Sequence, residues 1–108
     1  GMLTGKYQEA YPENSRLGLY GDWFTRYSND KCKKAVTEYL AVAKKFNLSL
    51  TQLALAFVNT RPFVSSNIIG ATTLNQLKEN IDSASINLSP EIIDEINNIH
   101  EQTPNPAP

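Results

Sequence analysis

Four stretches of the sequence repeat apolar residues every three or four positions, the spacing that gathers side chains on one face of an α-helix. The first covers residues 31–46. A second follows and ends at Arg61, because the residue before a proline is pushed out of the helical region. The others cover residues 74–83 and 90–101, so we expect about four helices. Their expected inward positions are Cys32, Ala35, Val36, Tyr39, Leu40, Ala43 and Phe46, then Leu50, Leu53, Ala54, Phe57 and Val58, then Leu74, Leu77 and Ile81, then Ile92, Ile93, Ile96 and Ile99.

Capping residues mark the starts of three of these helices. Ser49 is followed three positions later by Gln52, and Thr73 by Gln76, so each pair is a candidate capping box. Ser89 precedes a proline, an arrangement typical of an N-cap and the first helical residue. These local signals allow the helices to begin without help from distant parts of the chain.

Residues 63–69 are apolar at both ends and partly β-branched, which predicts one buried strand. A single strand cannot satisfy its own backbone N–H and C=O groups, and the chain offers no evident partner strand. Residues 1–30 have aromatic residues and turn-forming residues without a sustained period, so we expect a long loop. Residues 102–108 hold three prolines and predict an irregular tail. The imbalance between helices and strands indicates part of a larger fold.

Size and composition restrict the class of protein. With 108 residues, 41% hydrophobic and 19% charged, the chain is suited to one domain. A net charge of −1 provides no basic surface for nucleic acid, and no apolar run has the length of a membrane span. Cys32 is the single cysteine, which excludes an internal disulfide. The first residues lack the apolar core of a secretory signal, so we expect a cytoplasmic protein.

The segment of residues 68–80 is the strongest candidate for binding. The end of the predicted strand is followed by small residues and then by the first turn of a helix, which directs backbone N–H groups toward an anion. Taken alone, this pattern is more typical of a tight, capped turn than of a ligand site. His100, the only histidine, has no partner at metal-ligand spacing, so we predict no metal site.

Several blocks of sequence together resemble one family. The residues Gly1 to Tyr7 read G-M-L-T-G-K-Y, and F-T-R-Y, L-A-L-A-F-V and I-G-A-T follow in order. These blocks, with Gln76 and Asn80 after the last of them, resemble the C-terminal part of the aldo-keto reductases over essentially the whole chain. The resemblance implies a segment of an eight-stranded (β/α)8 TIM barrel, with its sites at the carboxyl ends of the strands. Alone, the chain should be mainly α, with about four helices and one remnant strand.

The resemblance also implies how a single partial domain, residues 1–108, corresponds to the barrel. Residues 1–30 would be the loop after the seventh strand, 31–62 two helices, 63–69 the eighth strand, 74–83 the last barrel helix, 90–101 the C-terminal helix, and 102–108 the tail.

By the same resemblance, the chain would bind NADP(H). The implied cofactor-binding residues are Leu3, Gly5, Lys6, Gly70, Ala71, Thr72, Gln76, Glu79 and Asn80. Many relatives carry Lys and Ser at the positions of Gly70 and Ala71 and Arg at that of Gln76, and these cations would pair with a 2′-phosphate. All three are uncharged here, which leaves the choice between NADPH and NADH open. Arg16 or Arg26 could supply the missing charge.

The family's catalytic residues come from earlier strands, and no residue of this chain corresponds to them. We therefore assign no catalytic residue and expect the cofactor-binding part of a carbonyl reductase, without turnover of its own. An alternative is a stand-alone helical interaction or oligomerisation domain derived from a truncated reductase. The expected partners are a nicotinamide dinucleotide and either a second copy or a missing N-terminal barrel part, with no nucleic acid and no membrane.

Overall fold

The helices account for most of the regular structure. The computed structural model describes the backbone of residues 1–108 and every side chain except that of Asp22. It contains four longer helices at the predicted places and one short additional helix in the region expected to be a loop. The α-helices are α1 (Arg16–Tyr20), α2 (Asp30–Lys45), α3 (Leu50–Asn59), α4 (Leu74–Asp82) and α5 (Pro90–Gln102), and the 3₁₀ turns are η1 (Met2–Thr4), η2 (Gly21–Trp23), η3 (Thr25–Tyr27) and η4 (Ser83–Ser85).

The capping predictions are largely confirmed. Ser49 and Gln52 form the complete capping box of α3, and the Ser89 hydroxyl caps α5. The Thr73 hydroxyl caps α4 by accepting from the backbone N–H of Gln76 at 3.2 Å. The other hydrogen bond of the predicted capping box, from the backbone N–H of Thr73 to the Gln76 side chain, is absent between these described residues. The Gln76 side chain instead accepts from the backbone N–H of Thr72, so this part of the prediction is wrong.

The core lies where α2 packs against α5 and α3. It confirms most of the predicted inward faces of these three helices, with Val42 and Ala56 also buried. At the edge of this contact, Lys45 on α2 bonds to Glu91 and Glu95 on α5, and these two carboxylates raise the pKa of Lys45, Glu95 more than Glu91. The central buried cluster is Cys32, Val36, Val42, Ala43, Leu50, Leu53, Ile92, Ile96 and Ile99.

Helix α4 differs from the prediction. Its expected inward residues Leu74, Leu77 and Ile81 are 83%, 39% and 60% exposed, and α4 buries none of its residues. The apolar stripe exists in the sequence, and α4 contacts α3 and η4, but these contacts leave most of Leu74 and Ile81 exposed. The prediction that these three side chains point into the core of this chain is therefore wrong.

The predicted remnant strand is also wrong for this chain. Residues 63–69 are irregular, with Phe63 82% and Ile68 95% exposed. Within the described residues no neighbouring strand is available, so the backbone of this segment has no ladder to join. Its main attachment is Asn67, whose side chain donates to the carbonyl of Leu55 at 3.3 Å and to Asn59 at 3.2 Å.

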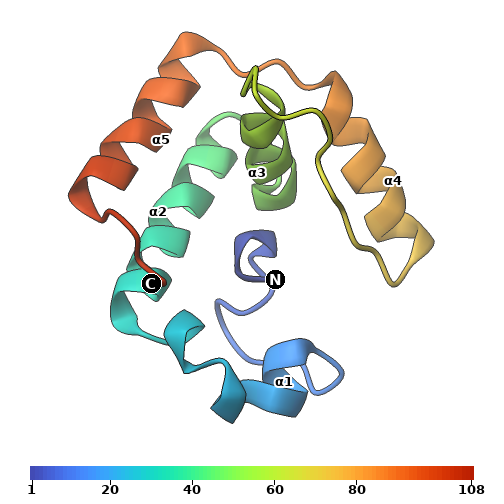
Figure 1. The fold of residues 1–108 in the computed structure, drawn as a ribbon, viewed down its shortest axis with the longest axis vertical. Helices are drawn as coiled ribbons and strands as arrows, with labels where there is room; N and C mark the ends of the chain where they lie inside the picture. The colour runs from blue at the N-terminus through green and yellow to red at the C-terminus, as the bar shows by residue number, and fades with distance from the viewer.

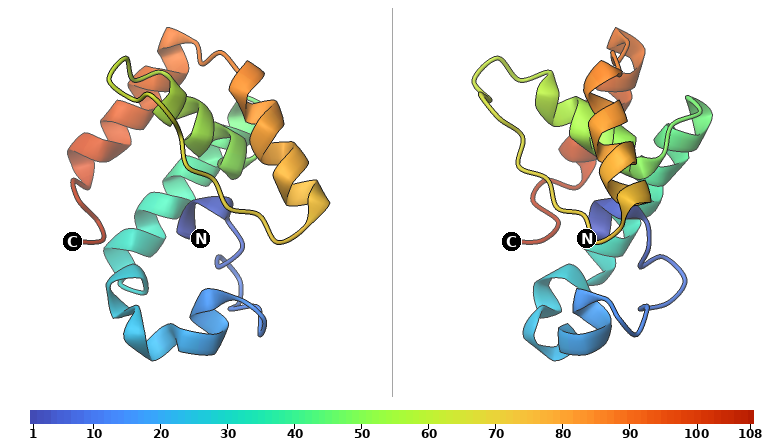
Figure 2. Two further views of the ribbon diagram at one scale, coloured as in Figure 1. Left: turned by 45° about the vertical axis from the view of Figure 1, so that its right-hand side comes forward. Right: turned by 90° about the vertical axis from the view of Figure 1, so that its right-hand side faces the viewer.

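The chain exposes more surface than a compact protein of its size. Its accessible surface is 7610 Å² for 12.0 kDa, whereas roughly 6,000 Å² is typical. Figure 1 shows why: the helices form an arc with α1 and α4 at its ends and the N-terminal turn inside it. Figure 2 shows residues 60–73 running as a long connection along one side. No helix in the described part of the chain is long and apolar enough to cross a membrane.

Candidate functional site

One open cavity of about 1120 Å³ lies inside the arc. Two segments far apart in the sequence, the N-terminal turn with α1 and the loop before α4 with α4 itself, contribute its walls. All the predicted cofactor-binding residues except Gly5 line it: Leu3, Lys6, Gly70, Ala71, Thr72, Gln76, Glu79 and Asn80. Gly5 instead ends η1 in a left-handed conformation, with φ of 76°.

The first wall carries positive charge. Lys6 and Arg16 line the cavity, and neither forms an ion pair with a described carboxylate. Their nearest aromatic neighbours are Tyr7, whose ring centre lies 5.0 Å from the Lys6 ammonium, and Phe24, 5.9 Å from the Arg16 guanidinium. Two unpaired cations facing an open space favour an anionic ligand.

Local contacts hold Arg16 in this wall. The Ser15 hydroxyl caps α1 by accepting from the backbone N–H of Gly18 at 3.1 Å. A Cβ on Gly18 would lie 2.2 Å from the carbonyl oxygen of Pro12, so the tight approach of the preceding loop requires glycine there. The start of α1, and therefore the position of Arg16, is fixed by this turn.

Tyr7 belongs to the same wall and is hydrogen-bonded to the first turn of α1. Its hydroxyl accepts from the backbone N–H of Leu17 at 3.4 Å. Burial alone would raise the pKa of Tyr7, but the hydrogen bonds with Ser15 and Leu17 and the charge of Lys6 outweigh it and lower the pKa. These hydrogen bonds hold the Tyr7 hydroxyl beside Ser15 and Leu17 in this wall.

The second wall is built from the loop and the first turns of α4. The Gln76 side-chain oxygen accepts from the N–H of Thr72 at 2.9 Å and from its hydroxyl at 3.0 Å. The Asn80 side chain donates to the carbonyl of Gly70 at 3.2 Å. Both amides line the cavity, and in this structure both hold the loop in place.

Gly70 lies beside open space. A Cβ at this position would meet no atom within 4 Å, and the backbone has no positive φ. The described residues therefore give no steric reason for glycine at position 70. A ligand that approaches the backbone closely is a reason for glycine of the kind seen in phosphate-binding turns.

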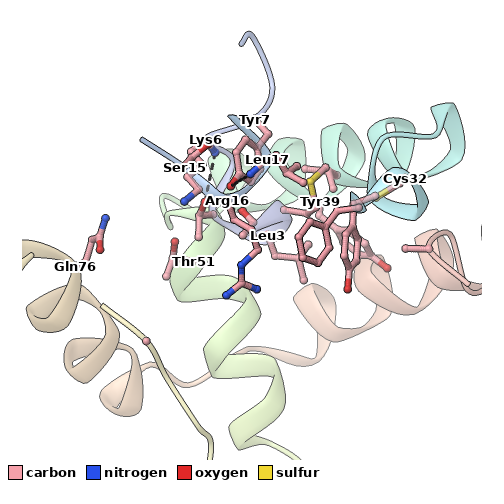
Figure 3. Close-up of a pocket in the computed structure, with 18 of the residues that line it drawn as sticks. Leu3, Lys6, Tyr7, Ser15, Arg16, Leu17, Cys32, Tyr39, Thr51 and Gln76 are labelled. Carbon is pink, nitrogen blue, oxygen red and sulfur yellow. Dashed lines mark hydrogen bonds between the residues drawn. The ribbon is translucent and has the colours of Figure 1, made fainter. Parts of the chain in front are cut away.

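Glu79 provides the only carboxylate among the lining residues that the structure describes. Its side chain accepts a hydrogen bond from the hydroxyl of Ser49 at the start of α3. Figure 3 shows Gln76 of the α4 wall across an open space from Lys6, Ser15 and Arg16. The cavity therefore has two cations, Lys6 and Arg16, on one wall and the carboxylate of Glu79 on the other.

Sequence reasoning did not identify Ser49 and Thr51 as lining residues. Ser49 was identified only as a helix cap, and a cap gives no information about what lies 30 residues further along the chain. Cys32 also lines the cavity while remaining buried, and burial raises the pKa of its thiol. No group of three potential metal ligands occurs among the described residues.

Comparison with known families identifies the family of the chain. The sequence pattern of the Aldo/keto reductase family matches residues 1–101. The chain belongs to the aldo/keto reductase family. The predicted resemblance is thereby confirmed, and the family is one of TIM-barrel proteins whose members typically bind a nicotinamide dinucleotide.

Three relatives illustrate the match. Protein tas of Escherichia coli (strain K12) is 45% identical over 109 residues, covering 100% of this chain and 31% of the relative. An aldo-keto reductase of Babesia bovis is 38% identical, covering 93% and 37%. A probable voltage-gated potassium channel subunit beta of Oryza sativa subsp. japonica is 36% identical, covering 96% and 33%. The chain thus spans about a third of the length of these relatives.

Proposed function

We propose that this chain is the C-terminal cofactor-binding part of an NADP(H)-dependent aldo/keto reductase. The observation that carries the proposal is the shared cavity. Leu3 and Lys6 lie more than 60 residues before Gly70 and Gln76, yet all four line one open space. Both segments were expected, from family resemblance alone, to contact the same dinucleotide.

In this proposal residues 1–30 are the loop after the seventh barrel strand and 63–69 are the eighth strand. Residues 31–62, 74–83 and 90–101 are the helices that cover the barrel, and 102–108 are the tail. The exposed apolar residues of α4 and of residues 63–69 support this assignment, because a barrel buries both faces of each strand and the inner faces of its helices.

The charge distribution supports a phosphate-bearing ligand. Lys6 and Arg16 would hold phosphate oxygens, and the N-terminus of α4 adds backbone N–H groups and the positive end of its dipole. The acceptor Glu79 suits the amino group of the adenine base better than a phosphate, since like charges repel. The bound dinucleotide would supply the hydride for carbonyl reduction, and we assign no proton donor in this chain.

Arg16 is the residue that we propose to select NADPH over NADH. Arg16 lines the cavity, whereas Arg26 does not. The Arg26 guanidinium donates to the Tyr27 hydroxyl at 2.6 Å and lies 4.7 Å from the centre of that ring. Of the two arginines considered for the 2′-phosphate, Arg16 therefore has the better supported role.

The test compares two arginine variants. We expect Arg16→Ala to weaken NADPH binding by about 10- to 100-fold, the cost of losing a hydrogen bond to a charged group. NADH has no 2′-phosphate and should lose much less. Arg26→Ala is the matched control and should bind both nucleotides as the unchanged chain does. Fluorescence titration measures all four affinities, and equal losses for NADPH and NADH in Arg16→Ala would contradict the assignment.

The exposed apolar surface favours a second candidate function, a helical interaction or oligomerisation domain. Leu74, Leu77 and Ile81 recur on one face of α4, as in helices that pack against a partner. Sedimentation equilibrium tests this candidate with the unchanged chain and with Leu77→Lys. A stable dimer that Leu77→Lys dissociates supports the oligomerisation role, and a monomer at all concentrations contradicts that role.

A further inference from the structure

A side-chain hydrogen bond joins Ser49, at the start of α3, to Glu79 on α4. Ser49 is the N-cap of α3 and Glu79 lies on α4, and both side chains line the cavity. The Ser49 hydroxyl donates its hydrogen to a Glu79 carboxylate oxygen. It also accepts from the backbone N–H of Gln52 at 3.1 Å. Ser49 therefore connects the first turn of one helix to the acid of another.

The direction of this hydrogen-bond chain is fixed. A serine hydroxyl has one hydrogen, and the carboxylate can only accept, so the hydroxyl must donate to Glu79. Accepting from the Gln52 N–H polarises the hydroxyl and strengthens the bond that it donates. The positive end of the α3 dipole also favours a negative group at this place. These effects favour the orientation of Glu79 in which one carboxylate oxygen lies beside Ser49.

We propose that Ser49 is a positioning residue that orients Glu79 to accept a hydrogen bond from the amino group of a purine base. One carboxylate oxygen is engaged by Ser49, and since Glu79 lines the cavity we assign the other oxygen to a donor there. A base amino group is such a donor, while a phosphate is repelled. This inference rests on the proposed function, because it concerns the adenine end of the same dinucleotide.

The test uses a substitution that removes the hydroxyl and largely preserves the helix cap. Glycine at an N-cap costs only a few tenths of a kcal/mol relative to serine. Ser49→Gly therefore breaks the link to Glu79 with little effect on α3. Ser49→Thr retains both the cap and the hydroxyl. Ser89→Gly makes the same substitution at the cap of α5, which does not line the cavity.

The measured quantity is the ratio of affinities for NADPH and for its hypoxanthine analogue, which lacks the amino group. We expect the unchanged chain to favour NADPH by about tenfold, the effect of one hydrogen bond to a charged acceptor. Ser49→Gly should reduce that ratio to about one, whereas Ser49→Thr and Ser89→Gly should preserve it.

The outcomes separate this inference from the proposed function. If Ser49→Gly binds NADPH with the same ratio as the unchanged chain, the positioning role is overturned and the cofactor site stands. If the unchanged, folded chain binds neither nucleotide, the proposed function is overturned and the inference is overturned with it. Circular dichroism of each variant confirms that the helices are present in the samples compared.

Discussion

The side-chain oxygen of Gln76 accepts two hydrogen bonds from Thr72, one from the backbone N–H at 2.9 Å and one from the hydroxyl at 3.0 Å. Asn80, one turn further along α4, donates to the carbonyl of Gly70. The helix therefore fixes the conformation of the loop that precedes it. A ligand entering the cavity meets a loop whose shape is already set, which lowers the entropy cost of ordering it on binding.

The first prediction concerns this loop. Gln76→Ala removes the acceptor for the Thr72 N–H, so we expect amide hydrogen exchange at Thr72 to accelerate by about five- to tenfold, as for one hydrogen bond. Gln76→Glu is the matched control, because a carboxylate accepts the same bonds and should keep exchange slow. NMR-detected exchange measures both. An unchanged rate in Gln76→Ala would show that the bond does not protect the loop.

The second prediction separates buried from exposed leucines. Leu53 is 2% exposed and Leu74 is 83% exposed. Leu53→Ala should lower the free energy of unfolding by about 2–5 kcal/mol, because it leaves a cavity in the core. Leu74→Ala should change it by less than about 0.5 kcal/mol. Urea denaturation compares the two variants, and similar losses would mean that the face of α4 is buried in solution.

Local signals in the sequence predict most of the helical structure. Ser49, Thr73 and Ser89 each cap a helix as expected, because an N-cap depends only on the next three residues. The short helix α1 was not predicted. It has five residues, and its start depends on the contact of Gly18 with the loop at Pro12, which no periodic pattern reveals.

Features that depend on distant partners were not predictable in the same way. The apolar stripe of α4 and the apolar ends of residues 63–69 have the pattern of buried segments. Burial also requires surfaces that pack against them, and most of their large apolar side chains are exposed here. At the candidate site, the family resemblance assigned Lys6 and Gln76 to different parts of one cofactor, and both line the cavity. Ser49 lies outside the motifs that carry this resemblance, and only its contact with Glu79 reveals its place in the cavity.

The third prediction concerns pH. Burial raises the pKa of the Cys32 thiol above its ordinary value of 9.0, so the folded chain keeps this proton where the unfolded chain loses it. The stabilisation is complete below pH 9 and is lost as the pH rises above 9, because the unfolded state then binds fewer protons. The free energy of unfolding should fall more steeply there in the unchanged chain than in Cys32→Ala. Urea denaturation from pH 8 to 10 measures both slopes, and parallel slopes would contradict the prediction.

The fourth prediction concerns the exposed apolar face of α4. Leu74 and Ile81 expose most of their surface, and contiguous apolar surface binds hydrophobic dyes. The double variant Leu74→Lys with Ile81→Lys should reduce the fluorescence of bound anilinonaphthalene sulfonate at least twofold, with no loss of helical circular dichroism. Gln102→Lys, at an exposed polar position of α5, is the control for added charge and should leave the fluorescence unchanged.

The central claim is that the wall holding Lys6 and Arg16 and the wall formed by α4 enclose one site for a nicotinamide dinucleotide. Calorimetric titration of the folded chain with NADPH tests it most directly. The account predicts saturable binding at one site per chain, weakened by added salt because Lys6 and Arg16 contact phosphate. The absence of binding heat at several temperatures, from a sample whose helices are intact, would contradict it.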